Sequence, residues 1–467
     1  MRRSIKALQA QPHHDFATDQ AQEVPCLAAS SHLLVPRGRA GEIMSLVPST
    51  SYRALLTRTG ARQFALAGLL ARLPISTVSI STMLMVQIQY GKWEIAGRVG
   101  AVGMAVWALQ TLPTARLIDR KGQRAMIPLA VLFVAGTVLL IVTAMTHGSE
   151  WLLWVGAGIS SISGPLGSLT RARWSHILDS DEQIHTAFAL EGAFDEVIFV
   201  AGPAFATAMA YAVHPASGLL VAVVANVTGL TLLLRQRTTE PPVRKVGSQG
   251  LGFRVPTGVI ATAFIAIGLG SMFGALDIST VAFAKAQGHG GAGGVVLGII
   301  SGGSFVGGLF YGAHKWRAPL WKRLLVGTLL LAAGFSLLST MPTFWTFAAV
   351  GFIVGMTIAP SITAQDSVAQ RLVPQDQLLE GMSWLRIGLG AGVAFGGWFS
   401  GRLIDAEGYR AGLNVMAFSA IAVAVFALAG SWWIRRDTLA ATAAGAVDDA
   451  PPPGGAHGEQ PPMIPVV

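Results

Sequence analysis

Five ionisable side chains stand inside long apolar stretches of the sequence, where a charge is costly to hold. Arg72 lies in the first stretch, Glu191, Asp195 and Glu196 lie together in another, and Asp277 lies in a third. Ionisable groups inside apolar membrane segments are rare, and they mark ion pairs and proton relays. We therefore expect these five residues to form a proton-coupling or ion-pair site.

The depths of these residues indicate how they combine. Arg72 lies about ten residues into its apolar segment and Asp195 about nine into its own, so at 1.5 Å per residue the depths nearly coincide. Glu191 and Asp195 share a helix face by i,i+4 spacing, whereas Glu196 points about 100° away. We expect one acid to pair with Arg72 and another to carry a proton. A purely structural ion pair is the alternative.

Other polar groups and a proline suggest moving parts. Asp366 and Arg386 stand near the ends of two later segments and are expected to form a cytoplasmic gate pair. Asp277 is expected either to be protonated, to face a cavity, or to cap a helix break near Gly274. Gly202 and Pro203 predict a kink whose freed carbonyl group is satisfied by a neighbouring helix, with simple packing as the alternative.

The composition excludes a soluble domain. The chain has 467 residues, 52% hydrophobic and only 12% charged, with 55 glycines, whereas soluble domains carry about 25% charge. The net charge of +9 is spread in short basic clusters between apolar runs, which is typical of loops facing anionic lipid and not of a nucleic-acid groove. The single cysteine, Cys26, gives no metal cluster, and no nucleotide-binding loop is present, so we expect no cofactor and no metal.

Membrane helices need about 20 mostly apolar residues, and the sequence contains twelve such runs. Lys/Arg excess marks the cytoplasmic side, and the basic connectors place both termini in the cytoplasm of a multi-pass plasma-membrane protein. The predicted runs are 63–88, 97–116, 125–146, 151–170, 187–212, 216–235, 256–284, 294–313, 324–341, 345–364, 382–402 and 411–434.

The longest internal polar connector divides these runs six and six, as in transporters built from two repeated bundles. We expect a cytoplasmic N-terminal extension (1–60), a six-helix bundle (61–235), a cytoplasmic linker (236–255), a second six-helix bundle (256–436) and a disordered cytoplasmic tail (437–467).

The segment Gly41-Glu42-Ile43-Met44 can be encoded by a purine-rich ribosome-binding site just upstream of an ATG. We therefore expect Met44 to be the natural start, with 1–43 not translated.

The connector after the second run resembles a signature of the major facilitator superfamily. Its sequence is Ala115-Arg116-Leu117-Ile118-Asp119-Arg120-Lys121-Gly122-Gln123-Arg124. The matching positions are Leu117, Asp119, Arg120, Gly122 and Arg124, while Ala115 and Gln123 depart from the family pattern. With the twelve runs, the resemblance implies an all-α membrane fold of two pseudo-symmetric six-helix bundles over about 60–436.

The resemblance also implies roles for single residues. Asp119 would form a latch between the bundles by accepting hydrogen bonds at the start of the eleventh run, near Ser383 and Trp384, where it would favour the helix dipole. Gly122 permits a tight turn with positive φ. Gly202-Pro203 is similar to the centre of a motif of proton-coupled exporters in that superfamily.

The predicted function is secondary active transport, most simply proton-coupled efflux of a small organic or drug-like molecule by alternating access. The alternatives are a proton-coupled importer or facilitator of a sugar or metabolite, and a polytopic membrane enzyme or sensor. The expected partners are a small-molecule substrate, protons and the lipid bilayer, and the protein is expected to act as a monomer.

Overall fold

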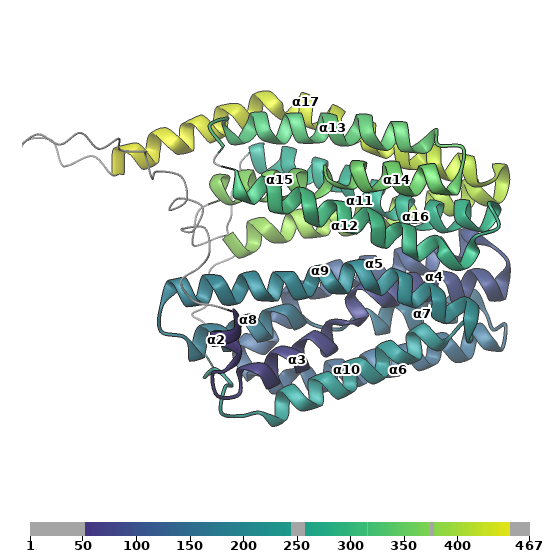
Figure 1. Ribbon diagram of the computed structural model, residues 1–467, viewed down its shortest axis with the longest axis horizontal. Coiled ribbons are helices and arrows are strands. Elements are labelled where there is room, and N and C mark those ends of the chain that lie inside the picture. Colours follow the sequence, from purple (N-terminus) through teal and green to yellow (C-terminus); the bar gives the residue numbers. More distant parts are fainter. Residues whose placement is uncertain (1–51, 244–256, 315, 374–377, 449–467) are drawn as a thin grey trace, which may run out of the picture. The chain divides into compact units, whose positions relative to one another are not determined.

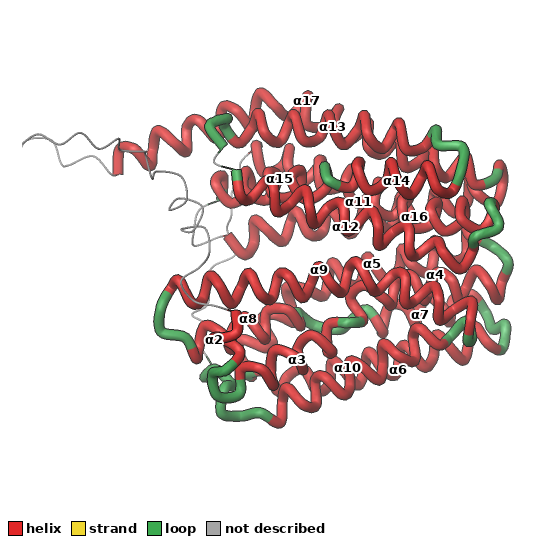
Figure 2. Tube along the Cα trace, in the orientation of Figure 1, coloured by secondary structure: helices red, strands yellow, loops and turns green. Residues whose placement is uncertain are grey.

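The computed structural model describes residues 52–243, 257–314, 316–373 and 378–448, and every regular element in these ranges is helical (Figures 1 and 2). The predictions about Met44 and residues 1–43 lie outside the described residues. The described helices belong to one compact unit. We call α2–α10 the N-terminal half and α11–α17 the C-terminal half.

The N-terminal half contains one short α-helix, eight longer ones and a single 3₁₀ turn among its described residues. The elements are α2 (Tyr52–Leu56), α3 (Ala61–Arg72), α4 (Pro74–Tyr90), α5 (Trp93–Lys121), η1 (Gln123–Ala125), α6 (Met126–Met145), α7 (Glu150–Ser160), α8 (Leu166–Ile177), α9 (Asp181–Ala212) and α10 (Ser217–Arg235).

The C-terminal half is built in the same way. Its elements are α11 (Thr257–Ala286), η2 (Gly290–Ala292), α12 (Gly293–Ala313), α13 (Leu320–Ser339), α14 (Phe344–Gly355), α15 (Ile358–Leu372), α16 (Leu378–Glu407) and α17 (Tyr409–Asp448).

Each of the twelve predicted runs lies on one helix or on two successive helices. Within the described residues, ten of these helical segments are long and apolar enough to cross a membrane. The fourth run is divided into α7 and α8 by the Ser161–Pro165 break, so neither piece is long enough. The eleventh lies in α16, whose central apolar stretch is flanked by Arg386 and by Arg402, Asp405 and Glu407.

Breaks and caps in the helices follow from local sequence. Proline has no backbone N–H and is well suited to the first turn of a helix, so α3 ends at Arg72 and α4 begins at Pro74. The disordered tail predicted from residue 437 is wrong for 437–448, because α17 continues to Asp448. Its Ala-rich sequence favours helix, and Asp437 accepts hydrogen bonds from the Gly258 backbone N–H at 2.8 Å and the Thr257 hydroxyl at 3.0 Å, at the start of α11.

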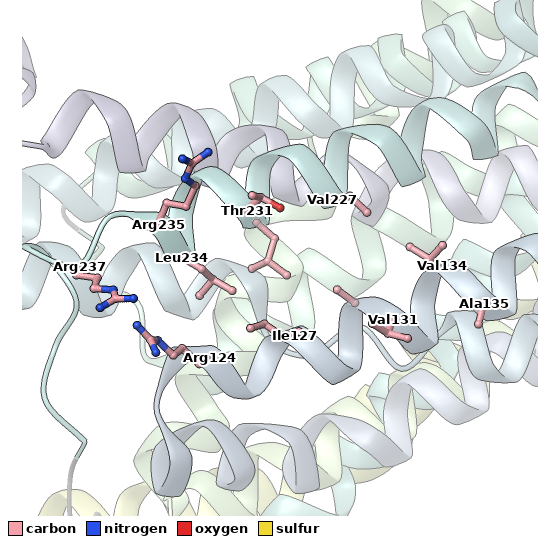
Figure 3. A pocket seen from close by; sticks show the side chains of 12 residues that line it. Arg124, Ile127, Val131, Val134, Ala135, Val227, Thr231, Leu234, Arg235 and Arg237 are labelled. Atoms are coloured by element: carbon pink, nitrogen blue, oxygen red, sulfur yellow. The ribbon is translucent and has the colours of Figure 1, made fainter.

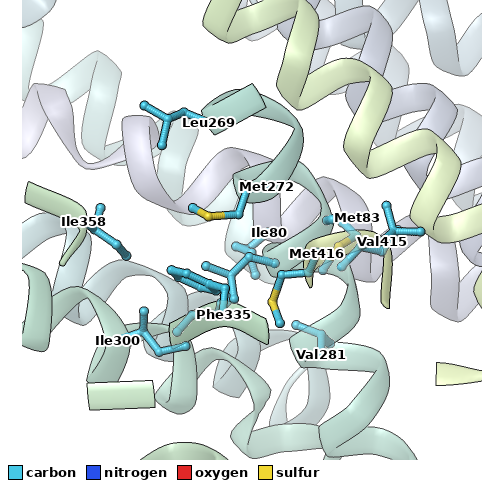
Figure 4. Close-up of a cluster of buried hydrophobic side chains, with 14 of the residues drawn as sticks. Ile80, Met83, Leu269, Met272, Val281, Ile300, Phe335, Ile358, Val415 and Met416 are labelled. Atoms are coloured by element: carbon cyan, nitrogen blue, oxygen red, sulfur yellow. The ribbon is translucent and has the colours of Figure 1, made fainter. Parts of the chain in front are cut away.

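Two apolar cores hold the helices together. The larger includes α4 of the N-terminal half and α11, α12, α13, α15 and α17 of the C-terminal half, and Figure 4 shows Met83, Met272, Phe335 and Met416 among its side chains. The smaller lies within the N-terminal half and contains Trp174, which meets Phe64 edge-on with ring centroids 4.7 Å apart. This second core surrounds the charged residues described next.

The helices alternate in direction, so the connectors collect at two ends. We call one the Gly408 end, which carries the connectors at 91–92, 146–149, 213–216, 287–289, 340–343 and 408. We call the other the Gly122 end, which carries those at 122–125, 178–180 and 236–243. In Figure 1 the Gly408 end is on the right.

Candidate functional site

Arg72 is the centre of a buried charge cluster. It is the last residue of α3, its side chain is 0% exposed, and its Nε donates to the Gly68 carbonyl at 3.1 Å. Its two terminal nitrogens donate to carboxylates on α9: Nη1 to Asp195 Oδ1 at 2.8 Å and Nη2 to Glu191 Oε2. The sequence analysis left open which acid pairs with Arg72, and in the structure both Asp195 and Glu191 do so.

Glu191 is bound by three hydrogen-bond donors of the protein. Besides Arg72, it accepts from the Thr170 hydroxyl at 2.9 Å and from the Trp174 indole N–H at 2.8 Å, both from α8, and its side chain is 0% exposed. Three donors from α3 and α8 fix the position of this buried carboxylate. Glu191 therefore belongs to the structural part of the cluster.

Asp195 extends the cluster to a second arginine. Its Oδ2 accepts from Arg171 Nη2 at 2.9 Å, and the two side chains are 27% and 37% exposed. Arg72, Arg171, Glu191 and Asp195 thus carry two positive and two negative charges. We call these four residues the balanced quartet.

Glu196 lies outside this balance. It is partly buried on α9, and in the described part of the chain it has neither a hydrogen bond nor an ion pair. Glu196 precedes Val200 by four residues and Pro203 by seven, so it shares their helix face. That face packs on α12, where a Cβ added at Gly298 would meet the Val200 carbonyl oxygen at 2.4 Å. Glu196 therefore faces the other half, one turn beyond this contact.

The candidate residues of the C-terminal half lie apart from the quartet. Asp277, on α11, is partly buried and has no hydrogen bond or ion pair to any residue that the structure describes. Asp366 on α15 and Arg386 on α16 are not within 4.0 Å of each other, so the predicted gate pair is not formed in this conformation.

The connector after α5 has the predicted turn. Gly122 has φ of 78°, a conformation that favours glycine, so this prediction is confirmed. Gln123, which departs from the family pattern, is buried and accepts from Arg173 Nε at 2.8 Å. Arg173 also donates to the Gln236 carbonyl at 2.7 Å and to the Thr239 hydroxyl at 2.8 Å. The connector is thereby tied to α8 and to the start of the linker.

The charged side chains of this connector make no hydrogen bond or ion pair within the described residues. Asp119, Arg120 and Arg124 are exposed, whereas Leu117 packs against the smaller core. Asp119 has no hydrogen-bond or ion-pair partner within residues 52–243, 257–314, 316–373 and 378–448, so its predicted contact near Ser383 and Trp384 is not made in this conformation.

Gly202 and Pro203 lie where three helices meet. α9 is one continuous helix through Pro203. A Cβ at Gly202 would overlap Ser76 of α4, whose hydroxyl donates to the Ile198 carbonyl at 2.9 Å, and a Cβ at Gly294 of α12 would lie 2.0 Å from the Pro203 carbonyl oxygen. The pair therefore permits close packing of α9 against both halves.

The two halves also meet closely through α5 and α16, toward the Gly408 end. A Cβ at Gly97 would lie 2.6 Å from the Gly397 carbonyl oxygen, and one at Gly401 would lie 2.4 Å from that of Trp93. Asp405 of α16 accepts from the backbone N–H groups of Trp93 at 3.0 Å and Glu94 at 2.7 Å, the first residues of α5. A carboxylate from one half thus caps a helix of the other.

The sequence analysis missed Arg171 and Asp405. Arg171 directly follows the predicted run 151–170 and so lies outside the apolar runs in which charged residues were sought. The break at Gly164-Pro165 was the available signal that a second helix, α8, would carry it into the cluster. Asp405 lies three residues past the end of the predicted run 382–402.

Comparisons with known proteins agree with this geometry. A family model described as Major Facilitator Superfamily matches residues 319–453. Solved structures of transporters share the arrangement of helices over most of the chain. A POT family transporter in complex with a thioalcohol-conjugated peptide superposes with a TM-score of 0.63 at 13% identity, covering 81% of this chain and 97% of that one.

Over residues 319–453 the chain thus resembles the major facilitator superfamily. Its fold is likewise similar to that of the nucleoside transporter NupG (TM-score 0.63, 13% identity, 80% of this chain and 98% of that one). It is similar too to a bacterial homologue of the iron transporter ferroportin in an inward-facing state (0.63, 14%, 82% and 100%). Among curated proteins none matches the sequence. At these identities the solved structures show a shared fold, that of known transporters, and ten helical segments of the described residues are long and apolar enough to cross a membrane.

Proposed function

We propose that this transporter is a proton-coupled exporter of a small organic molecule that works by alternating access. The observation that carries the proposal is the position of Glu196, an unpaired carboxyl group beside the balanced quartet and on the face of α9 that meets the other half. The quartet needs no further negative charge. A carboxyl group in such a place is cheaper to hold neutral, and a change in its protonation alters the free energy of bringing the two halves together.

Alternating access requires two sets of contacts that cannot form together. In this conformation the contacts at the Gly408 end are made: the glycine faces of α5, α12 and α16, the Asp405 cap, and a hydrogen bond from Lys285 Nζ to Gln87 Oε1 at 3.2 Å. We propose that Asp119 caps α16, and that Asp366 pairs with Arg386, in the opposite conformation. Asp405 and Asp119 would then make equivalent contacts at opposite ends, each capping a helix of the other half.

Asparagine in place of Asp405 should open the Gly408 end. Hydrogen bonds to a charged group contribute about 1.5–3 kcal/mol, and asparagine retains one neutral acceptor. We therefore expect a loss of about 1–2 kcal/mol, which shifts the ratio of open to closed molecules about 5- to 30-fold. Spin labels at two exposed connector positions, Thr146 and Thr340, report the separation of the halves there.

Asp437→Asn is the matched control for this substitution. Asp437 caps the start of α11 with the same chemistry, but both groups belong to the C-terminal half. The control should leave the separation of the halves unchanged. Equal distance distributions in wild-type protein and in Asp405→Asn would show that the cap does not hold this end closed.

We propose that the Gly122 end faces the cytoplasm of the cell, because its connectors carry most of the loop arginines and lysines. The conformation described here is then inward-facing, as in the ferroportin homologue. In a Cys26→Ser background, Thr238→Cys should react with a membrane-impermeant thiol reagent only from the cytoplasm. A cysteine at Gly291, in η2, should react only from outside. Reaction of both from the same side contradicts this orientation.

Export is the proposed direction because Gly202-Pro203, the pair similar to the exporter motif, lies at the contact between α9 and α12. Transport of a panel of small organic compounds into inside-out vesicles, with and without an imposed pH gradient, tests the proposal. Gradient-driven accumulation inside these vesicles supports export. Accumulation only in right-side-out vesicles favours the importer of a sugar or metabolite, and indifference to the gradient contradicts proton coupling. The protein is proposed to act as a monomer.

A further inference from the structure

An apolar groove with a basic end runs along the outer surface of the N-terminal half, between α6 and α10. Its volume is about 840 Å³. The lining residues come from these two helices and the segments at their Gly122 ends: Arg124, Ile127, Ala130, Val131, Val134, Ala135, Val227, Leu230, Thr231, Leu234, Arg235 and Arg237. Figure 3 shows the three arginines toward one end, with the Arg235 guanidinium directed away from the other two, and the apolar side chains along the rest.

The three arginines form an uncompensated positive site. Arg124 precedes α6, Arg235 ends α10 and Arg237 follows it, and all three are exposed. Figure 3 shows Arg124 and Arg237 directed toward one another. No carboxylate of the described residues lies within 4.0 Å of their guanidinium groups. Three like charges at one groove end repel one another unless an anion lies between them.

The remainder of the groove is an apolar channel along the two helices. From Ile127 to Ala135 the lining covers eight residue steps of α6, or about 12 Å at 1.5 Å per residue. Ile127 and Val131 are 52% and 62% exposed, and on a membrane-spanning helix this surface faces lipid. The arginines stand at helix ends, where a bilayer has its headgroups.

We propose that this groove binds one anionic phospholipid, with its phosphate-bearing headgroup on Arg124, Arg235 and Arg237 and an acyl chain along α6 and α10. Arginine suits this task because its planar guanidinium binds phosphate oxygens in pairs. A zwitterionic lipid brings its own cation to the headgroup and would leave the three arginines without net compensation. By the proposed orientation the lipid belongs to the inner leaflet, and the binding itself does not depend on the transported substrate or on proton coupling.

Titration of the purified full-length protein in detergent tests the proposal by thermal unfolding. The probes are phosphatidylglycerol, phosphatidylcholine and water-soluble glycerol phosphate. We expect saturable stabilisation by phosphatidylglycerol, a much weaker effect of phosphatidylcholine, and none from glycerol phosphate at the same concentration. Equal effects of the two lipids would overturn the headgroup assignment, and stabilisation by glycerol phosphate alone would show an anion site without a lipid.

A triple substitution, Arg124→Gln with Arg235→Gln and Arg237→Gln, should weaken the apparent affinity for phosphatidylglycerol about a hundredfold. Each basic residue near a lipid phosphate contributes roughly a factor of five. The matched control replaces Arg58, Arg62 and Arg317 by glutamine, which removes the same charge from exposed positions outside the groove. An equal loss in the control would show non-specific charge attraction and overturn the site.

A second variant keeps the arginines and tests the acyl-chain part. Val131→Trp places a bulky side chain in the middle of the groove, where Val131 is already exposed to lipid. We expect it to weaken phosphatidylglycerol binding while the protein stays folded, since no buried contact is lost. Unchanged binding in this variant would overturn the placement of the chain between α6 and α10.

Discussion

Leucine in place of Arg72 should lower the free energy of unfolding by about 3–5 kcal/mol, because it leaves buried acids without their counter-charge. Glu191 is affected most, since it is 0% exposed and its remaining donors, Thr170 and Trp174, are neutral. Asp195 keeps Arg171 as a partner. Thermal and denaturant unfolding in detergent measure the change.

The double substitution Arg72→Leu with Glu191→Leu should restore much of the lost stability, because it removes both members of the buried pair. Glu196→Gln is the matched control, since it removes a carboxylate from the same helix at a position outside the balanced quartet. Wild-type stability in Arg72→Leu would mean that water compensates Glu191 and that the quartet is not a structural unit.

Glutamine in place of Glu196 should abolish accumulation driven by a pH gradient while exchange of substrate across the membrane continues. One proton moving down a gradient of one pH unit supports about tenfold accumulation. Glutamine has the size of glutamic acid but releases no proton, so the substrate path keeps its shape and loses its coupling. Uptake and counterflow in proteoliposomes, with a compound found by the vesicle experiment, separate these two activities.

Asp195→Asn is the comparison for this test. Asp195 is the adjacent acid, but it is bound to Arg72 and Arg171, so its loss should lower stability more than coupling. Full gradient-driven accumulation in Glu196→Gln would place the coupling site elsewhere. Asp277 is then the next residue to replace, because it is the other carboxyl group that was predicted inside an apolar run and has no partner within the described residues.

The fold was predictable because a bilayer permits few solutions. Apolar runs of the right length must be helices, and the connector containing Asp119 and Gly122 resembles a signature of the major facilitator superfamily. The positions of Arg72 and Asp195 followed from depth along two helices, since 1.5 Å per residue converts sequence separation into height. An ion pair of this kind can be predicted from the sequence when both residues lie within apolar runs.

The remaining partners depended on information that hydropathy does not contain. Arg171 and Asp405 stand just past the ends of apolar runs, where hydropathy alone does not distinguish a loop from a continued helix. Their roles depend on the break at Gly164-Pro165 and on the approach of α16 to α5. The stretch 437–448 was misjudged for a related reason, because its composition suits a tail as well as a helix.

The central claim is that the two halves open alternately at the two ends, and pairs of spin labels in proteoliposomes test it most directly. One pair, Thr146 and Thr340, lies at the Gly408 end, and the other, His176 and Gln370, lies on exposed surfaces of α8 and α15 near the Gly122 end. Gly294→Ala, whose added Cβ would meet the Pro203 carbonyl oxygen at 2.0 Å, should bias the protein away from the conformation described here. The account predicts that this variant lengthens the first distance and shortens the second. If both distances lengthen or both shorten, or if neither changes, the result contradicts alternating access.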